Sequence, residues 1–487
     1  MKKILIILTA VVMLVCAPVL TASAANYNYH AEQLNALGLF KGTGSGYDLE
    51  RAPNRAEGVT MLVRLLGLET EAEGGAYEHP FSDVPAWADD NVALAYEKGF
   101  TTGTTTETFG PGGLCTAQMY VTFVLRALGY SDADASSGVL YDEALDFGKK
   151  IGIVDSALLS GDFLRGEMTA VSYLALTTAT KGGQYGTLLE KLVDEGAVTA
   201  EAAAGLLGRI AMYNEIFGGA AGAEGLNALA AIADIALDIT MMSNKNTIEG
   251  EAYISLIMTE TGVVASIAVE MATDEEGAEG TTLSIYVADE CAYIDSGDSK
   301  TKMSLESLIG EESAGSIAGE ASLNPFYWIE SISKSSQGGV TTYTVEIVKG
   351  FADDMINSAL SEALAGDGVA DMLGSMNLGE MSLMVPLLST MKVSTDALVM
   401  KFSVDADGMI VGLELDFGLG AKMPLVPLPL LALTLKLTVD VTDYGEGIVI
   451  EAPEDLDEYV EGEGFSLGSL MGAMGGLSGP SEVTDEG

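Results

Sequence analysis

The pattern of apolar and polar positions changes along this 487-residue chain. Up to about residue 182, apolar residues recur at helical spacing in short stretches that end at glycine. Gly38, Gly99 and Gly152 follow such stretches, where a left-handed residue commonly ends a helix. From residue 247 onward, apolar residues alternate with polar ones, as in half-buried antiparallel strands. The pattern predicts a multidomain chain with an all-helical N-terminal part followed by a large antiparallel sheet.

The helical part contains three self-similar stretches. Each consists of a helix that ends at glycine, a polar loop, and a second amphipathic helix. A unit of this kind cannot bury its apolar face alone, so neighbouring units must stack against one another. We therefore predict three repeats, at residues 27–70, 79–131 and 138–182, that pack into one bundle.

Two motifs of these repeats resemble a known family. Repeat 2 begins with HPFSDVPAWADDNVALAYEKGF and continues to FGPGG, and repeat 1 contains NRAEG at residues 54–58. Both look like the S-layer homology (SLH) domain of bacterial surface proteins, in which three tandem copies are usual. The resemblance implies an all-helical bundle with pseudo-threefold symmetry. It also implies non-covalent anchoring to a secondary cell-wall polysaccharide, often a pyruvylated one.

The resemblance further implies which side chains bind the glycan. The family's Thr-Arg-Ala-Glu signature corresponds to Arg55 and Glu57 in repeat 1 and to Arg165 and Glu167 in repeat 3. A pyruvyl ketal carries a carboxylate, and a guanidinium can hold a carboxylate through paired hydrogen bonds. These four residues are therefore candidates for a glycan-binding site.

Repeat 2 departs from the signature and contributes different candidates. Ala117 and Met119 stand where the arginine and the glutamate are expected, so we expect at most two working glycan grooves. The start of repeat 2, which carries the resemblance, implies Asp83 and Trp87 as further glycan contacts, since an indole can stack on a sugar ring. Two simpler interpretations stay open: Asp83 as a helix N-cap and Trp87 as a core residue.

The rest of the chain divides by pattern into a connector, a sheet domain and a tail. Residues 183–245 are predicted to form a helical connector, with its third helix over AEGLNALAAIADIALDITMM. Residues 246–460 are predicted to form an antiparallel domain of eight or more strands, with a hairpin turn at 405–408 and one helix at about 351–365. Residues 461–487 are rich in glycine and acidic residues, which indicates a flexible tail.

The apolar face of the predicted sheet must be covered. Met-rich and Pro-rich segments of the chain can fold over it as ordinary core, or the sheet can curl into a half-barrel around an apolar ligand. Residues 442–459, TDYGEGIVIEAPEDLDEY, are similar to the end of curved-sheet lipoproteins of the LolA and LppX type. That resemblance implies an alternative function, an extracellular carrier of a lipid or another apolar ligand.

Charge and the N-terminus bear on location. The chain has 71 acidic and 23 basic residues and a formal charge of −48, which disfavours nucleic acid and anionic membranes as partners. Residues 1–24 have a basic start, an apolar run and an Ala-Ser-Ala site, as a signal peptide does. We therefore expect a secreted protein in the cell wall or S-layer of a bacterium, without a membrane span in the mature chain.

Catalytic chemistry is not indicated. The chain has only two histidines, His30 and His79, which gives no basis for a Ser-His-Asp triad. Cys115 has no foreseeable partner and is expected to be a buried thiol, and the acidic turns do not match an EF-hand spacing. We predict no enzyme activity, no cofactor and no metal site, and a wall-anchored protein that displays a β-rich module of unknown ligand.

Overall fold

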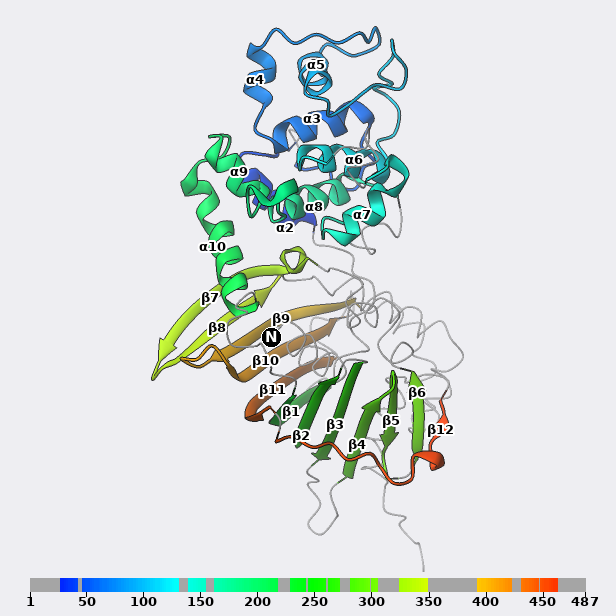
Figure 1. Cartoon of the computed structure of the whole chain (residues 1–487), viewed down its shortest axis with the longest axis vertical. Coiled ribbons are helices and arrows are strands. Elements are labelled where there is room, and N and C mark those ends of the chain that lie inside the picture. The colour runs from blue at the N-terminus through cyan, green and yellow to red at the C-terminus, as the bar shows by residue number, and fades with distance from the viewer. Residues whose placement is uncertain are drawn as a thin grey trace, which may run out of the picture. The chain divides into compact units, whose positions relative to one another are not determined.

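The computed structural model forms two compact units (Figure 1). The helical unit comprises Ala24–Tyr213 and Ala321–Glu330, and the sheet unit comprises Met1–Ser23, Asn214–Glu320 and Ser331–Gly487. The structure describes residues 27–42, 46–130, 139–154, 162–217, 228–241, 244–259, 262–271, 281–297, 299–304, 324–348, 392–422, 431–445 and 447–462. The predicted signal peptide, the helix at 351–365, the Met-rich segment and the tail beyond Gly462 lie outside these residues.

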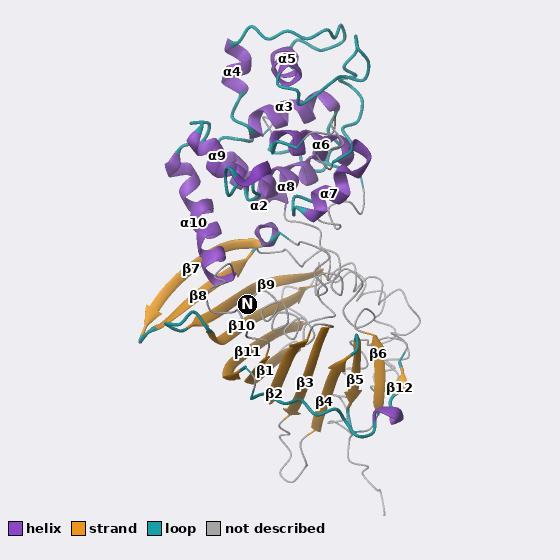
Figure 2. Ribbon diagram, viewed as in Figure 1, coloured by secondary structure: helices purple, strands orange, loops and turns teal. Residues whose placement is uncertain are grey.

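Short helices make up the helical unit (Figure 2). They are α2 (Tyr27–Ala36), α3 (Arg55–Leu65), α4 (Glu69–Gly74), α5 (Asp89–Glu97), α6 (Ala117–Ala127), η3 (Tyr141–Glu143), α7 (Ala144–Lys150), α8 (Arg165–Leu176), η5 (Lys181–Gly183), α9 (Leu188–Asp194), α10 (Ala200–Phe217) and η7 (Pro325–Tyr327).

Two helices joined by a loop lie within each of the three predicted repeat ranges. Repeat 1 contributes α2 and α3, repeat 2 contributes α5 and α6, and repeat 3 contributes α7 and α8. The glycines predicted to end the first helices have φ values of +76° at Gly38, +75° at Gly99 and +75° at Gly152. A side chain is strained at such φ values, so glycine sets the point where each first helix stops.

Loops of one repeat support helices of another. The backbone N–H of Arg55, which begins α3 in repeat 1, donates to the carbonyl of Gly113 in the loop of repeat 2 at 2.8 Å. In the same way, the N–H of Arg165 at the start of α8 donates to the carbonyl of Arg51 in the loop of repeat 1 at 2.9 Å. Because first-turn N–H groups have no partner within their own helix, these bonds join the repeats as well as capping the helices.

A distant segment of the chain completes the helical unit. The imidazole of His30 on α2 stacks on the ring of Tyr327 in η7, and its Nε2 lies 3.0 Å from the Tyr327 carbonyl oxygen. Arg209 on α10 donates to the carbonyl of Glu330 and, at 2.8 Å, to the side chain of Gln33. Pattern reasoning gave no hint of this contact, because η7 lies far along the chain from α2.

The sheet unit is one open sheet of twelve strands within the described residues. Its strands are β1 (Ala228–Met241), β2 (Asn244–Thr259), β3 (Gly262–Met271), β4 (Thr281–Ala288), β5 (Cys291–Asp295), β6 (Lys300–Ser304), β7 (Ile329–Gln337), β8 (Val340–Ile347), β9 (Lys392–Val404), β10 (Ile410–Lys422), β11 (Leu431–Tyr444) and β12 (Val460–Glu461). Their order is β12-β6-β5-β4-β3-β2-β1-β11-β10-β9-β8-β7, and the short pair β12–β6 is parallel. The predicted fold class, helices followed by a large antiparallel sheet, is confirmed.

Alternation along the strands separates a buried face from an exposed one. On β10, Leu413, Leu415 and Phe417 are buried, whereas Glu414 and Asp416 between them are exposed, as predicted. The hairpin turn predicted at residues 405–408 joins β9 to β10, with Gly408 at φ +83°. The side chains that form the core of this unit can therefore be identified from the alternation of apolar and polar residues in the sequence.

One predicted element is wrong. The connector was expected to be helical to residue 245, but residues 228–241 form strand β1, which pairs with β2 on one side and β11 on the other. The segment satisfies both periods, because apolar residues fill nearly every position and alanine favours helices. Hydrogen bonding to two long neighbours, which bury Leu229 and Ala233 completely, outweighs that local preference.

Candidate functional site

The first turn of α3 holds the candidate Arg55 in a fixed position. Asn54 is the N-cap: its side-chain oxygen accepts from the N–H of Glu57 at 2.9 Å. In return, the carboxylate of Glu57 accepts from the N–H of Asn54 at 2.8 Å, which completes a capping box. Together with the bond to the loop of repeat 2, this cap fixes the backbone from which the Arg55 side chain extends.

The guanidinium of Arg55 lies in a mostly apolar site. The residue is 7% exposed, and its guanidinium carbon lies 5.0 Å from the ring centre of Phe109 and 5.6 Å from that of Phe123. Its polar contacts are weak: Nη2 lies 3.3 Å from the Thr101 hydroxyl and Nη1 lies 3.7 Å from the Met119 sulfur. No acceptor among the described residues bonds Nε. Burial lowers the pKa of Arg55 below its usual range, so its positive charge is poorly compensated.

Arg165 begins α8 and is equally buried, at 8% exposed, but it is better satisfied. Its Nε and Nη2 both lie 3.3 Å from the carbonyl oxygen of Tyr47, and its guanidinium lies over the ring of Phe40 at 5.8 Å. Burial lowers the pKa of Arg165, and attraction to Glu57 opposes that effect. The two arginines that the sequence singled out therefore lie in different electrostatic surroundings.

Glu57 is occupied by contacts within the unit. Besides capping α3, it accepts two hydrogen bonds from Arg51, at 3.0 Å from Nη1 and 2.6 Å from Nη2. Burial acts to raise its pKa, but the bonds from Arg51 and Asn54 outweigh burial and hold the pKa below the usual range. Sequence reasoning missed Arg51, although it stands only a few residues before the signature.

Glu167 has an equivalent structural role. One oxygen accepts from the N–H of Leu164 at 2.8 Å, and the other accepts from the hydroxyl of Tyr27 at 2.9 Å. The carboxylate thus links the start of α8 to the start of α2. Whether Glu57 and Glu167 also contact a glycan stays a prediction.

Asp83 supports the Arg55 site indirectly. Its carboxylate accepts from the N–H groups of Phe109 and Gly110, at 2.7 and 2.9 Å, and these bonds lower its pKa. The alternative of an N-cap for the following helix is wrong, because Ala88 occupies that position at α5. Asp83 instead holds the loop that places the Phe109 ring beside the guanidinium of Arg55.

Trp87 is exposed to solvent. At 57% exposed, its side chain is not part of the core, so the interpretation as a core residue is wrong. An exposed indole on a surface protein is free to stack on a ligand. Its role as a glycan contact remains a prediction.

The residues that surround Arg55 could not be identified from repeat 1 alone. Thr101, Phe109, Met119 and Phe123 all belong to repeat 2, whereas Arg55 belongs to repeat 1. The only sign of this site in the sequence was the repeat pattern, because stacked repeats contact one another through their loops. The sequence alone does not show which loop lies against which helix.

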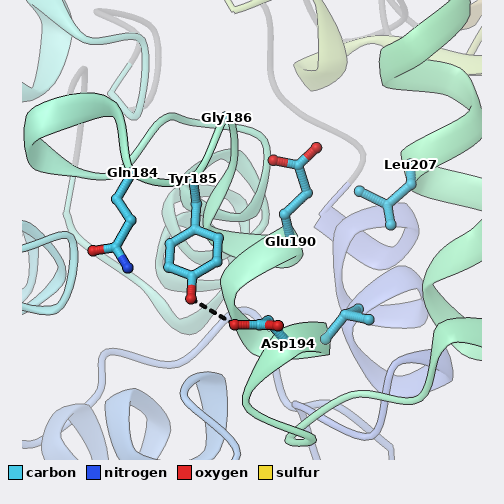
Figure 3. Close-up of a pocket in the computed structure, with 7 residues that line it drawn as sticks. Gln184, Tyr185, Gly186, Glu190, Asp194 and Leu207 are labelled. Atoms are coloured by element: carbon cyan, nitrogen blue, oxygen red, sulfur yellow. Dashed lines mark hydrogen bonds between the residues drawn. The ribbon is translucent and has the colours of Figure 1, made fainter.

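A hollow elsewhere in the helical unit is lined mainly by acidic and neutral groups (Figure 3). It has a volume of about 420 Å³ and lies where Tyr185, Glu190, Asp194 and Leu207 converge. The hydroxyl of Tyr185 donates to Asp194 at 2.7 Å, shown as a dashed line. No lining residue is basic, so this hollow does not suit an acidic ligand.

No group of three or more His, Cys, Asp or Glu side chains among the described residues is placed to hold a metal ion. No helix within the same ranges is long and apolar enough to cross a membrane. Cys115 is a buried free thiol, as predicted, and burial raises its pKa to about 12.

Comparison with protein families identifies one domain. The family model of the S-layer homology domain matches residues 80–116, which include Asp83, Trp87, the Arg55-facing Phe109, and the loop that caps α3. Residues 80–116 form an S-layer homology domain. The resemblance inferred from the motifs of the repeats is thereby confirmed for repeat 2, the repeat whose beginning carried it.

Curated relatives match this chain over less than a third of its length. A cell surface protein of Thermoanaerobacter kivui is 32% identical over 156 residues, 31% of this chain and 20% of that protein. A middle cell wall protein of Brevibacillus brevis is 29% identical over 141 residues, 28% of this chain and 13% of that protein. An endoglucanase of Bacillus sp. strain KSM-635 is 34% identical over 82 residues, 17% of this chain and 8% of that enzyme. The chain thus spans a fifth or less of the length of these relatives.

Among solved structures, LprF of Mycobacterium bovis is similar over 47% of this chain and 90% of its own chain, at 9% identity and a TM-score of 0.21. A score this low carries no argument about the fold. The resemblance of the sheet unit to curved-sheet lipoproteins therefore stays a prediction. By contrast, the SLH domain and the surface-protein relatives confirm the predicted location, a secreted protein associated with the cell wall.

Proposed function

We propose that this SLH protein is held non-covalently on an acidic secondary cell-wall polysaccharide by its helical unit, and that the sheet unit is the part it displays. The observation that carries the proposal is the state of Arg55. This guanidinium is 7% exposed and has two weak polar contacts, and no acceptor among the described residues bonds its Nε. A buried charge without a partner is costly, and an incoming carboxylate removes that cost.

The chemistry of the site suits an acidic sugar. A carboxylate such as that of a pyruvyl ketal offers two oxygens, which match the fork of N–H groups on a guanidinium. The flanking rings of Phe109 and Phe123 exclude water and strengthen the interaction. Trp87, exposed in the same SLH domain, is proposed to stack on a sugar ring.

The charge of −48 has to be reconciled with an acidic ligand. Repulsion between exposed charges falls off over about 8 Å at physiological ionic strength, whereas contact at Arg55 acts at hydrogen-bonding distance. The proposal therefore implies that polysaccharide binding is weakest at very low salt, where repulsion from the whole chain extends furthest. Divalent cations of the wall reduce the same repulsion.

We infer a non-enzymatic role. Relatives named as cell surface and cell wall proteins favour this inference, and the endoglucanase shares similarity over only 8% of its own length. The alternative of an apolar-ligand carrier rests on the sheet unit. No described side chain or contact specifically favours it.

The test uses the full chain, because α10 and η7 belong to the helical unit and a fragment ending at residue 183 lacks both. Purified protein is sedimented with cell-wall sacculi that carry or lack their secondary polysaccharide. We expect binding only with the polysaccharide, and at least tenfold weaker binding for Arg55→Ala. Arg64→Ala is the matched control, because Arg64 lies on the same helix and pairs with Glu69 instead.

Two outcomes contradict the proposal. The first is wild-type protein that stays in the supernatant with polysaccharide-bearing sacculi at all salt concentrations. The second is Arg55→Ala protein that sediments as well as the Arg64→Ala control while retaining a normal unfolding midpoint.

A further inference from the structure

We infer that the exposed face of the sheet unit, over strands β2 to β6, binds an uncharged polysaccharide through a group of tyrosine rings. This surface, called the tyrosine platform below, consists of Tyr253, Ser266, Tyr286, Tyr293 and Tyr459. The inference goes beyond the proposed function, because it assigns a ligand class to the unit that is displayed. It involves neither Arg55 nor the repeats.

Strand register brings the members of the platform together. On β2 to β5 they alternate with residues that face the core, so all of them lie on the exposed face. Ser266 on β3 lies directly opposite Tyr286 on β4, and Tyr286 lies directly opposite Tyr293 on β5. Tyr253 on β2 lies opposite Ala268, which is two residues along β3 from Ser266. The platform therefore crosses four neighbouring strands.

The rings are held in place and remain accessible. The ring centres of Tyr286 and Tyr293 are 6.0 Å apart, and the ring of Tyr459 meets that of Tyr293 edge-on at 5.5 Å. Tyr459 is positioned between η9 (Leu456–Glu458) and β12, which pairs with β6. Tyr253 is 43% exposed, and the other three tyrosines are half-buried. Rings that support one another and still reach solvent can stack on a ligand at little ordering cost.

The charges beside the platform favour an uncharged ligand. Lys302 lies 5.7 Å from the ring centre of Tyr293 and pairs with Glu461 at 3.9 Å. Lys300 pairs with two carboxylates, one of which is that of Glu458 at 2.9 Å. Both lysines are thus already matched by carboxylates, so they offer little to an acidic polymer.

Carboxylates also border the platform on the side of β2 and β3. Glu251 and Glu270 lie opposite each other in register, one row beyond Tyr253 on the same face. They repel an anionic chain at close range, and the charge of −48 on the whole protein adds to that repulsion. The platform is therefore complementary to a neutral polymer and not to an acidic one.

The chemistry of the platform matches a chain of sugars. A pyranose ring has a face of C–H groups, which can stack on a tyrosine ring, and an edge of hydroxyls. Ser266 lies opposite Ser255 in register, and a serine hydroxyl both donates and accepts hydrogen bonds. The tyrosine rings are tilted relative to one another, which fits a single twisted chain better than a flat crystalline surface.

A protein partner fits the platform less well. A stable protein interface buries about 800 Å² on each side and has an apolar centre. Here small polar side chains such as that of Ser266 lie between the rings, and the carboxylates of Glu251 and Glu270 lie beside them. We therefore commit to a polysaccharide as the occupant.

The experiment is affinity electrophoresis of the full-length protein in native gels that contain hydroxyethyl cellulose, arabinoxylan or galactomannan, which are soluble and uncharged. We expect at least one of these polymers to retard the protein. Tyr286→Ala and Tyr293→Ala should each weaken the binding about tenfold, because each removes a stacking face. Tyr293→Phe keeps the ring and should bind nearly as well as the wild type. Tyr77→Ala is the matched control, since it removes a half-buried ring from the helical unit.

Three outcomes overturn the inference. The first is wild-type protein that none of the three polymers retards. The second is Tyr286→Ala and Tyr293→Ala proteins that are retarded as strongly as the Tyr77→Ala control. The third is a change of oligomeric state in the same two variants, measured by sedimentation velocity, without any change in retardation, which would make the platform a contact between copies of this chain.

Two further variants keep the test decisive. Tyr253→Ala removes the most exposed of the four rings and should also weaken retardation, so the inference can be tested even where a substitution at a packed ring impairs folding. Arg55→Ala should be retarded as the wild type is, because an uncharged polymer does not need the guanidinium. Loss of sacculus binding in Arg55→Ala with normal retardation therefore separates the platform from the proposed anchor.

Discussion

The helical unit contains all six arginines of the chain, whereas lysine is the only basic residue type in the sheet unit. In the helical unit, Arg126 donates to the carbonyl of Phe100 at 2.7 Å, and Arg165 and Arg209 also donate to backbone carbonyls of segments distant in sequence. In the sheet unit, lysine pairs mainly with exposed carboxylates, as Lys401 does with Glu414 at 2.6 Å.

This difference reflects how each unit is held together. Short helices leave many backbone groups without partners, so caps and side chains that reach between repeats must satisfy them. Long antiparallel strands satisfy each other's backbone and bury a continuous apolar face, and their charged side chains remain in solvent. Polar contacts are therefore expected to matter more in the helical unit, and apolar packing more in the sheet unit.

The largest expected effect is on the sheet core. Phe402 on β9 is buried, with Tyr343 and Leu413 in register on either side. Phe402→Ala should reduce the free energy of unfolding of this unit by about 4 kcal/mol, through lost burial and a residual cavity. Hydrogen exchange of peptides from β9 and β10 measures this loss of stability. The control is Val399→Ala on the opposite face of the strand, which should cost less than about 1 kcal/mol.

Both tryptophans, Trp87 and Trp328, belong to the helical unit. Trp87 lies far in sequence from the unit boundary at residues 330–331, so its fluorescence, observed in Trp328→Phe protein, follows the helical unit. A shift of the fluorescence-detected midpoint by Phe402→Ala, as large as the shift seen by exchange in β9, would contradict the division of stability between the two units.

The second prediction concerns acid. His30 is buried among Tyr29 on α2, Tyr173 on α8 and Tyr327 on η7, with Arg209 of α10 bonded to Tyr29, and burial lowers its pKa to about 4. Between that pKa and its ordinary value near 6.5, the unfolded chain binds a proton that the folded chain does not. The stability due to neutral His30 is complete above pH 6.5 and falls by about 3 kcal/mol as the pH drops to 4.

Tryptophan fluorescence during denaturant unfolding, repeated between pH 4 and 7, measures this loss. His30→Gln keeps an amide that can reach the Tyr327 carbonyl but cannot be protonated in this range. Between pH 7 and 4, the free energy of unfolding of His30→Gln should fall by about 3 kcal/mol less than that of the wild type. An equal fall in the two proteins would refute this role of His30.

The third prediction compares a cap with a surface ion pair. Asn54→Ala removes the N-cap of α3 and should lower the stability of the helical unit by about 1 kcal/mol. Lys401→Ala removes the ion pair with Glu414, whose two side chains are about half exposed, and should cost no more than about 0.5 kcal/mol in the sheet unit. Chemical unfolding measures both losses, with tryptophan fluorescence as the probe of the helical unit and hydrogen exchange as the probe of the sheet unit. Equal losses of stability would contradict the expectation that polar contacts matter more in the helical unit.

The smallest effect should be stabilising. Glu251 on β2 lies directly opposite Glu270 on β3 and Asp234 on β1, so three carboxylates form a row across the exposed face. Like charges in register repel, and threonine favours strands, so Glu251→Thr should add about 0.5 kcal/mol at low salt and less at high salt. Glu249→Thr is the control, because Glu249 faces Ala236 on β1.

The sequence allowed the repeats to be predicted because their signals are local. Gly38, Gly99 and Gly152 mark helix ends wherever they are placed, and alternation over β10 identifies its buried face without knowledge of its neighbours. Residues 228–241 were assigned to the wrong class because only pairing with β2 and β11 decides between helix and strand there. A local sequence pattern predicts a helix or a strand only when its apolar positions fit one of the two periods and not both.

The candidate site was predicted in part. The signature identified Arg55 and Arg165, which the structure places at equivalent helix starts, but it could not rank them, because their surroundings come from other repeats. It marked Trp87, which proved exposed, and it missed Arg51, whose importance depends on which loop meets which helix. Such contacts between segments distant in the chain are set by tertiary packing, which single-sequence patterns do not encode.

The packing of residues 324–330 against α2 and α8 has a consequence for the order in which the protein becomes functional. A secreted chain crosses the membrane from its N-terminus, so the three repeats arrive outside the cell well before η7 does. Until Glu330 has emerged, Arg209 lacks this carbonyl partner and the ring of His30 lacks its stacking partner Tyr327. Under the proposed function, the anchor is complete only after residues 324–330 have been exported, and a chain interrupted before them would lack part of the helical unit.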